Sequence, residues 1–135
     1  MLIGGYAVIY YGYERTTSDM DIWLEPSNQN KEKLVHALTE FGVLQEDLNR
    51  LSDIDYSKHQ FFFFGKKPRR IDFLNFITGV TYAEAIKEAN LFPLKDQKIP
   101  IIQYHHLILS KISNNRDKDK ADIAELQRID KYRNK

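Results

Sequence analysis

Hydrophobic and polar residues alternate in two segments of the chain, 18–24 and 70–77, and such alternation is typical of β-strands. In the first segment Asp19 and Asp21 fall on one side, because successive side chains of a strand point to opposite faces. The other side of that segment is apolar, with Met20, Ile22 and Leu24. The second segment carries Asp72 among apolar neighbours. The pattern therefore predicts two strands that carry carboxylates.

A helical period follows the first of these strands. Leu34, Leu38 and Phe41 recur at the spacing of one helix face, Ser27 suits an N-cap, and Gly42 suits the end of the helix. Similar patterns predict helices at 6–11, 104–112 and 117–132, a helix capped by Thr81 that ends near residue 90, and strands at 2–3, 61–64 and 98–102. The four phenylalanines at 61–64 are expected to form a strand that is buried on both faces. The polar segment 45–58 has no clear pattern.

Composition limits the classes of protein to which the chain can belong. With 135 residues, 42% of them hydrophobic and 29% charged, residues 1–135 are expected to form a single soluble domain. The net charge of +1 gives no reason to expect strong nonspecific attraction to nucleic acid. The chain contains no cysteine, which excludes disulfides and thiolate metal sites and fits a cytoplasmic location. No apolar run is long enough to span a membrane, and no signal peptide is expected.

The acidic residues of the two strands point to a metal site. If the strands are neighbours, Asp19, Asp21 and Asp72 converge on one spot. Like charges in close contact disfavour each other's ionisation, so such a cluster is hard to explain without a divalent cation. Upstream, Gly4-Gly5 would let a phosphate approach the backbone closely. Together these residues predict metal-assisted chemistry on a nucleoside triphosphate.

Several short motifs lie between Leu2 and about Leu126: Gly4-Gly5-Tyr6-Ala7; Gly12, Arg15 and Thr17; Asp19-Met20-Asp21; Arg70-Ile71-Asp72-Phe73-Leu74; Leu107-Ile108-Leu109-Ser110-Lys111; and Arg116, Lys118-Asp119 and Asp122. In this combination they resemble the nucleotidyltransferase superfamily. They are most similar to a small bacterial branch that carries Gly-Gly in place of Gly-Ser and includes toxin–antitoxin proteins.

The resemblance implies an α/β (α+β) fold with a mixed β-sheet flanked by helices, which binds a nucleoside triphosphate and two Mg²⁺ ions. Asp19 and Asp21 would hold the metals, and Asp72 would share one metal and accept the proton of the attacking hydroxyl. The residues that would bind the nucleotide are Gly4, Gly5, Arg15, Lys111 and Arg116.

The chain departs from the family pattern at two places. Gly5 stands where a serine would donate its hydroxyl to phosphate, so the backbone amides would have to compensate. The chain also begins within the expected first strand, before which family members often have a helix; either a truncation or cover borrowed from a partner would expose apolar surface near Leu2 and Ile3.

These features favour transfer of a nucleoside monophosphate to a hydroxyl acceptor, which could be a small molecule, RNA or protein. Two alternatives stay open. The first is a noncatalytic nucleotide-binding protein or toxin–antitoxin component of the same fold, acting with a protein partner. The second is an RNA-binding module that uses the basic segment 66–70. Two other patterns have simpler explanations: Asp53 and Asp55 repeat the acid spacing on an expected surface, and segment 111–122 could be a solvated helix face with charge pairs.

Overall fold

A mixed six-stranded β-sheet organises the fold, which is described by a computed structural model for residues 1–134. The strand order is β3-β4-β2-β1-β6-β5. The strands are β1 (Leu2–Ile3), β2 (Asp19–Trp23), β3 (Phe61–Phe64), β4 (Arg70–Leu74), β5 (Asn90–Leu94) and β6 (Gln97–Ile101). Strand β2 runs parallel to β4 and antiparallel to β1, so the two acid-bearing strands are direct neighbours. The predicted α+β class is confirmed.

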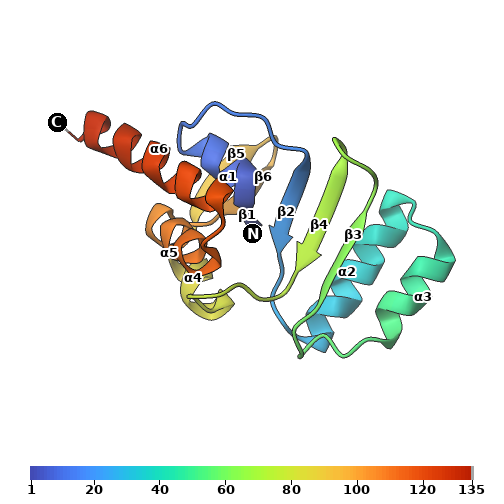
Figure 1. The fold of residues 1–135 in the computed structure, drawn as a ribbon. Helices are drawn as coiled ribbons and strands as arrows, with labels where there is room; N and C mark the ends of the chain where they lie inside the picture. Colours follow the sequence, from blue (N-terminus) through green and yellow to red (C-terminus); the bar gives the residue numbers. More distant parts are fainter. Residues whose placement is uncertain (135) are drawn as a thin grey trace.

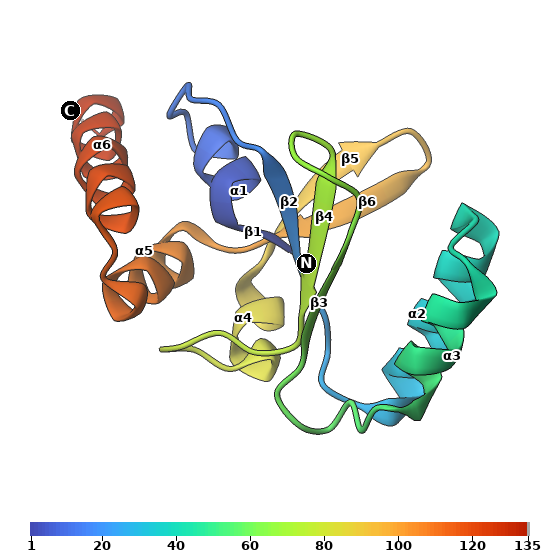
Figure 2. The same ribbon diagram turned by 45° about the vertical axis from the view of Figure 1, so that its right-hand side comes forward.

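Helices cover both faces of this sheet. They are α1 (Gly4–Tyr10), α2 (Asn28–Phe41), α3 (Gln45–Asp53), α4 (Tyr82–Glu88), α5 (Tyr104–Asn114) and α6 (Asp117–Arg133). Helices α2 and α3 lie against one face, at the β3–β4 side, as Figure 1 shows. Helices α1, α4, α5 and α6 lie on the opposite side (Figure 2). None of the helices in the described part of the chain is long and apolar enough to cross a membrane.

Two hydrophobic clusters hold these layers together. The cluster under α2 and α3 includes Leu34, Leu38 and Phe73, and the apolar side of β2 packs against it through Ile22. The other cluster lies between the sheet and helices α1, α4 and α5, where Trp23 is buried. The alternation in β2 thus packs Ile22 on one face and leaves the acids on the other, where Trp23 enters the second cluster.

The capping residues explain where several helices begin and end. Ser27 accepts a hydrogen bond from the Asn30 amide at 3.1 Å and starts α2, and Gly42 ends that helix in the left-handed conformation, with φ of 95°. Thr81 caps α4 as predicted. Phe41 does not follow the prediction: it lies on the solvent side of α2, 73% exposed, because only Leu34 and Leu38 of that set face the sheet.

Other elements also differ from the sequence prediction. Segment 45–53 is a helix, α3, and its Leu48 and Leu51 are buried. Strand β4 ends at Leu74 and not at residue 77, because the next side chain, Asn75, is buried and hydrogen-bonds to the backbone of Tyr56 and Lys58. Strand β5 was not predicted. It contains a proline, but a strand at the edge of a sheet tolerates one.

Two predictions about exposure are wrong. Strand β3 is not buried on both faces: Phe61 and Phe63 are about half exposed, because β3 is an edge strand and only the face that carries Phe62 and Phe64 is covered. In β1, an inner strand of the sheet, Ile3 is buried and Leu2 is half-buried, so the apolar surface expected there is largely covered.

Candidate metal centre

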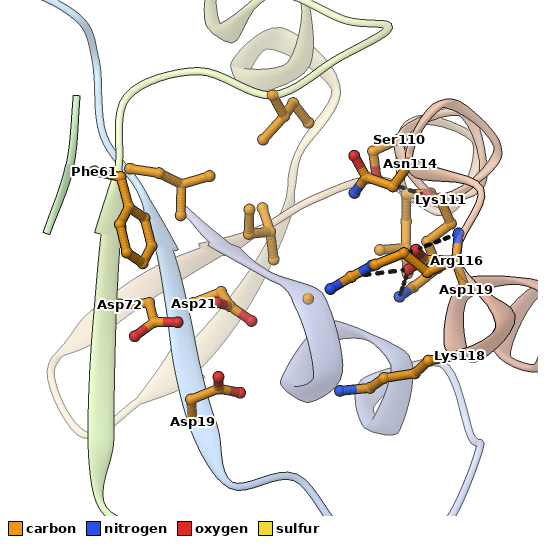
Figure 3. Close-up of a pocket in the computed structure, with 15 residues that line it drawn as sticks. Asp19, Asp21, Phe61, Asp72, Ser110, Lys111, Asn114, Arg116, Lys118 and Asp119 are labelled. Carbon is orange, nitrogen blue, oxygen red and sulfur yellow. Dashed lines mark hydrogen bonds and ion pairs between the residues drawn. The ribbon is translucent and has the colours of Figure 1, made fainter. Parts of the chain in front are cut away.

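Three carboxylates converge on one face of the sheet, as the sequence predicted. Asp21 and Asp72 are directly paired across the parallel strands β2 and β4, and Asp19 lies two residues before Asp21 on the same face. One carboxylate oxygen from each residue lies within 4.8 Å of the others. Figure 3 shows the three side chains grouped on the two strands. Carboxylate oxygens at such spacing form a donor set that suits a hard divalent cation.

Gly4 makes room for this cluster at the point where β1 turns into α1. Its φ is +65°, and a Cβ at this position would lie 2.1 Å from Oδ2 of Asp21. Gly4 therefore serves both the turn and the placement of a carboxylate. Gly5 has a different neighbourhood: it is buried, and a Cβ there would lie 2.5 Å from Oγ1 of Thr17. Of the glycine pair, only Gly4 lines the cleft beside the acids.

The electrostatics of the cluster also favour a cation. Burial, followed by the charges of Asp19 and Asp72, raises the pKa of Asp21 from 3.8 to about 6. Both causes disfavour the ionised carboxylate, and a bound cation would offset both of them. The donor set therefore fits a divalent metal ion.

Arg70 is a site residue that sequence reasoning missed. Its Nε donates to Oδ1 of Asp72 at 2.5 Å, two residues along β4, and its guanidinium lies 3.9 Å from the centre of the Phe63 ring. The sequence analysis placed Arg70 in a basic hairpin tip. The alternation of β4 offered a signal, because it places residues 70 and 72 on the same face.

Across from the acids, helices α5 and α6 supply a basic wall. The acids and this wall line a single cleft of about 470 Å³. Arg116 and Lys118 are exposed there and extend toward the acids in Figure 3. The charge of Lys118 lowers the pKa of Asp21, although less than burial and the two acids raise it. Lys118 was not among the predicted nucleotide-binding residues, although it lies in the Lys118-Asp119 motif.

Beneath this wall lies a buried charge network. The Lys111 ammonium contacts Asp122 at 2.8 Å and Asp119 at 3.5 Å, and Arg15 contacts Asp122 at 2.8 Å. Asp119 also accepts from Arg116 at 2.7 Å. The segment is therefore not a solvated helix face, because Lys111 and both carboxylates are buried.

The network separates the predicted nucleotide-binding cations into two groups. Arg116 reaches the cleft with its side chain 65% exposed, although its guanidinium also donates to both carboxylate oxygens of Asp119. Lys111 borders the cleft, but two carboxylates hold its ammonium. Arg15 is directed to Asp122 and does not line the cleft. Arg116 and Lys118 are thus the cations presented to a ligand.

The remaining patterns lie away from the cleft. Asp53 and Asp55 are exposed, and Asp55 accepts hydrogen bonds from Asn28 and Ser57, so the repeated acid spacing is a surface feature as predicted. Lys66 and Lys67 are exposed at the turn between β3 and β4.

Comparison of the chain with models of known protein families and with curated proteins found no match. The resemblance of its motifs to the nucleotidyltransferase superfamily stays a prediction, and the site is interpreted from its own geometry.

Proposed function

We propose that this protein is a metal-dependent nucleotidyltransferase, which transfers a nucleoside monophosphate from a nucleoside triphosphate to a hydroxyl acceptor. One observation carries the proposal: three converging carboxylates face two exposed cations, Arg116 and Lys118, across one cleft. A metal–triphosphate complex has the matching distribution of charge, with a cation for the acids and phosphate oxygens for the basic wall.

The protein's residues divide into three roles. Asp19, Asp21 and Asp72 would hold Mg²⁺, which prefers oxygen ligands and would supply charge stabilisation at the attacking and leaving oxygens. Arg116 and Lys118 would bind the triphosphate. Gly4 leaves space at the acids, where a side chain would collide with Asp21.

The reaction assigned to the site is a single displacement. The acceptor oxygen forms a bond to the α-phosphorus, the bond from that phosphorus to the bridging oxygen breaks, and pyrophosphate leaves with the electron pair. The hydroxyl proton passes to Asp72. Arg70 occupies one oxygen of that carboxylate, Oδ1, which orients the carboxylate and leaves Oδ2 for the proton or the cation.

The test is binding and transfer with nucleotides labelled at the α-phosphate, with and without Mg²⁺ and in the presence of cell extract as a source of acceptors. Asp19→Asn and Asp21→Asn should abolish transfer and metal-dependent nucleotide binding while the fold is retained. Asp53→Asn is the matched control, because Asp53 belongs to the exposed copy of the acid pattern.

Each outcome separates the candidate functions. Label on an acceptor, lost in both variants and kept in the control, supports the enzyme. Metal-dependent nucleotide binding without transfer favours the noncatalytic alternative, a nucleotide-sensing or toxin–antitoxin component. Transfer that survives either substitution refutes the metal-site assignment.

A further inference from the structure

Strand β3 presents two aromatic side chains on the same face of the sheet as the acids. The antiparallel pairing of β3 with β4 places Phe63 opposite Asp72 and Phe61 opposite Leu74. Paired residues of neighbouring strands share a face, so Phe61, Phe63 and Asp72 all point to the cleft side. Phe61 is 52% exposed and Phe63 is 51% exposed.

Phe61 belongs to the wall of the cleft itself. It lines the cleft together with Asp72, Leu74 and Ile77, and Figure 3 shows its ring next to the Asp72 side chain. The Phe63 ring lies 6.5 Å from the Phe61 ring, between centroids, and carries the Arg70 guanidinium over it. The two rings and the guanidinium form a surface of flat groups beside the proposed proton acceptor, which we call the aromatic wall (Phe61, Phe63 and Arg70).

Exposure of these rings is costly unless something covers them. Apolar surface is unfavourable in water, and an edge strand that exposes large apolar side chains invites unwanted association. Charged residues or prolines usually protect such edges, but β3 consists of four phenylalanines. This departure from the usual composition indicates that the aromatic wall binds a ligand.

The cleft also has two chemically different sides. Arg116 and Lys118 come from the α6 side, and Phe61 of the aromatic wall comes from the β3 side, with the acids between them. In the displacement proposed above, the attacking and leaving oxygens stand roughly in line on opposite sides of the phosphorus. If pyrophosphate leaves toward the cations, the acceptor hydroxyl enters from the side of Phe61.

We infer that the aromatic wall is the acceptor-binding surface, and that the acceptor carries a planar unsaturated ring close to its hydroxyl. This inference rests on the proposed function for the direction of entry. A phenol and a nucleoside share this chemistry, because each offers a flat ring that can stack on Phe61 and a hydroxyl that can reach Asp72. The donor nucleotide is held by the metal and the cations and does not depend on Phe61.

The test uses four small probes of matched polarity. Two contain a planar unsaturated ring, N-acetyltyrosinamide and uridine, and two are their counterparts without such a ring, N-acetylserinamide and ribose. Saturation-transfer NMR measures probe binding to the full chain without any reaction. A labelled nucleoside triphosphate with Mg²⁺ then measures donor binding and transfer to each probe.

Three variants separate the contribution of the flat Phe61 ring to probe binding from that of apolar character alone. Phe61→Ala removes the ring, and Phe61→Leu keeps an apolar side chain but removes the flat surface. Phe41→Ala is the control, since Phe41 is an exposed phenylalanine on α2 away from the cleft. Both Phe61 variants should retain the fold, because the side chain is half exposed.

We expect at least one ring probe to bind, and which one binds distinguishes a phenol from a nucleoside. Phe61→Ala and Phe61→Leu should weaken that binding by about tenfold or more. Donor binding by the two Phe61 variants should change by no more than about twofold. The Phe41 variant should bind both the probes and the donor within about twofold of the wild type.

Three results would overturn the inference: no preference for ring probes, full binding by Phe61→Leu, or loss of donor binding in Phe61→Ala. The last result would assign the ring to the base of the donor nucleotide. Ring binding that depends on Phe61 in the absence of any transfer would leave the aromatic wall in place and count against the proposed function alone.

Discussion

The Asp21 carboxylate occupies the space that a side chain at position 4 would fill. A Cβ on Gly4 would lie 2.1 Å from Oδ2 and 2.9 Å from Cγ of Asp21, a separation at which something must move. The glycine that allows β1 to turn into α1 is therefore also the residue that fixes the position of a proposed metal ligand. Backbone conformation and chemistry are coupled at this single contact.

Gly4→Ala should therefore lower the free energy of unfolding by more than backbone strain alone would. Gly42→Ala is the matched control: its φ is +95°, but no atom lies within 4 Å of the added Cβ. We expect the control to lose about 1–2 kcal/mol of unfolding free energy, the typical cost of a left-handed residue with a side chain. Gly4→Ala should lose more and should also weaken Mg²⁺ binding, because it displaces Asp21. Urea denaturation and calorimetric metal titration measure the two effects. Equal losses of stability, with metal binding intact in both variants, would contradict this coupling.

Asp21→Asn should stabilise the metal-free protein above pH 6. Burial, followed by the charges of Asp19 and Asp72, raises the pKa of Asp21 to about 6, above its value of 3.8 in the unfolded chain. Between these values the folded state holds a proton that the unfolded state has lost, so this residue lowers stability as the pH rises. At a fully buried site, this pKa difference would make the variant more stable than the wild type by up to about 3 kcal/mol. Because Asp21 is partly exposed, we expect a gain in unfolding free energy of about 1 kcal/mol.

Urea denaturation of the wild type and Asp21→Asn across pH checks this sign. The variant should gain stability relative to the wild type as the pH rises from about 4 to 6, with a constant difference above that window. Saturating Mg²⁺ should stabilise the wild type and not the variant, because only the wild type binds the metal. A variant that is less stable than the wild type at neutral pH would show that the ionised carboxylate is not under repulsion.

The sequence predicted the acid cluster because the strand period determines which side chains share a face. Asp19 and Asp21 could be placed together from β2 alone, and only the adjacency of β2 and β4 had to be assumed. That adjacency could not be derived from local pattern, because a parallel pair is joined by a long connection. The two intervening helices and β3 form this connection.

Features that depend on the position of a strand within the sheet were missed. Four consecutive phenylalanines look like a buried strand, but at the sheet edge only one face is covered, and Phe61 faces the cleft. The role of Lys111 was also hidden, because the spacing of charges on α5 and α6 does not reveal that the two helices bury those charges against each other. Helix α3 was the avoidable omission, since Leu48 and Leu51 have helical spacing.

Lys111→Met should destabilise the fold strongly. The Lys111 side chain is 6% exposed, and its ammonium is shared by Asp119 and Asp122, whose side chains are 1% and 2% exposed. Removing one partner of a buried ion pair leaves uncompensated charge and typically costs about 3–5 kcal/mol. The control is Arg128→Met, which removes an exposed pair with Glu125 on α6 and should leave the stability nearly unchanged. Thermal and urea unfolding of both variants measure the difference. If Lys111→Met keeps wild-type stability and loses only nucleotide binding, Lys111 contacts phosphate and the network is not structural.

The basic turn between β3 and β4 separates the enzyme from the RNA-binding alternative. Lys66 and Lys67 are exposed and do not line the cleft, so the double variant Lys66→Gln/Lys67→Gln should leave nucleotide binding and transfer unchanged within about twofold. The control is Lys95→Gln/Lys98→Gln, which removes the same charge from the exposed hairpin of β5 and β6. Fluorescence anisotropy with a single-stranded RNA, at salt between about 50 and 200 mM, measures RNA affinity.

With a net charge of +1, we expect RNA binding to be weak and equal in the two double variants. Affinity that falls steeply with salt, disappears only in the Lys66/Lys67 variant and survives Asp72→Asn would instead assign the protein to RNA binding.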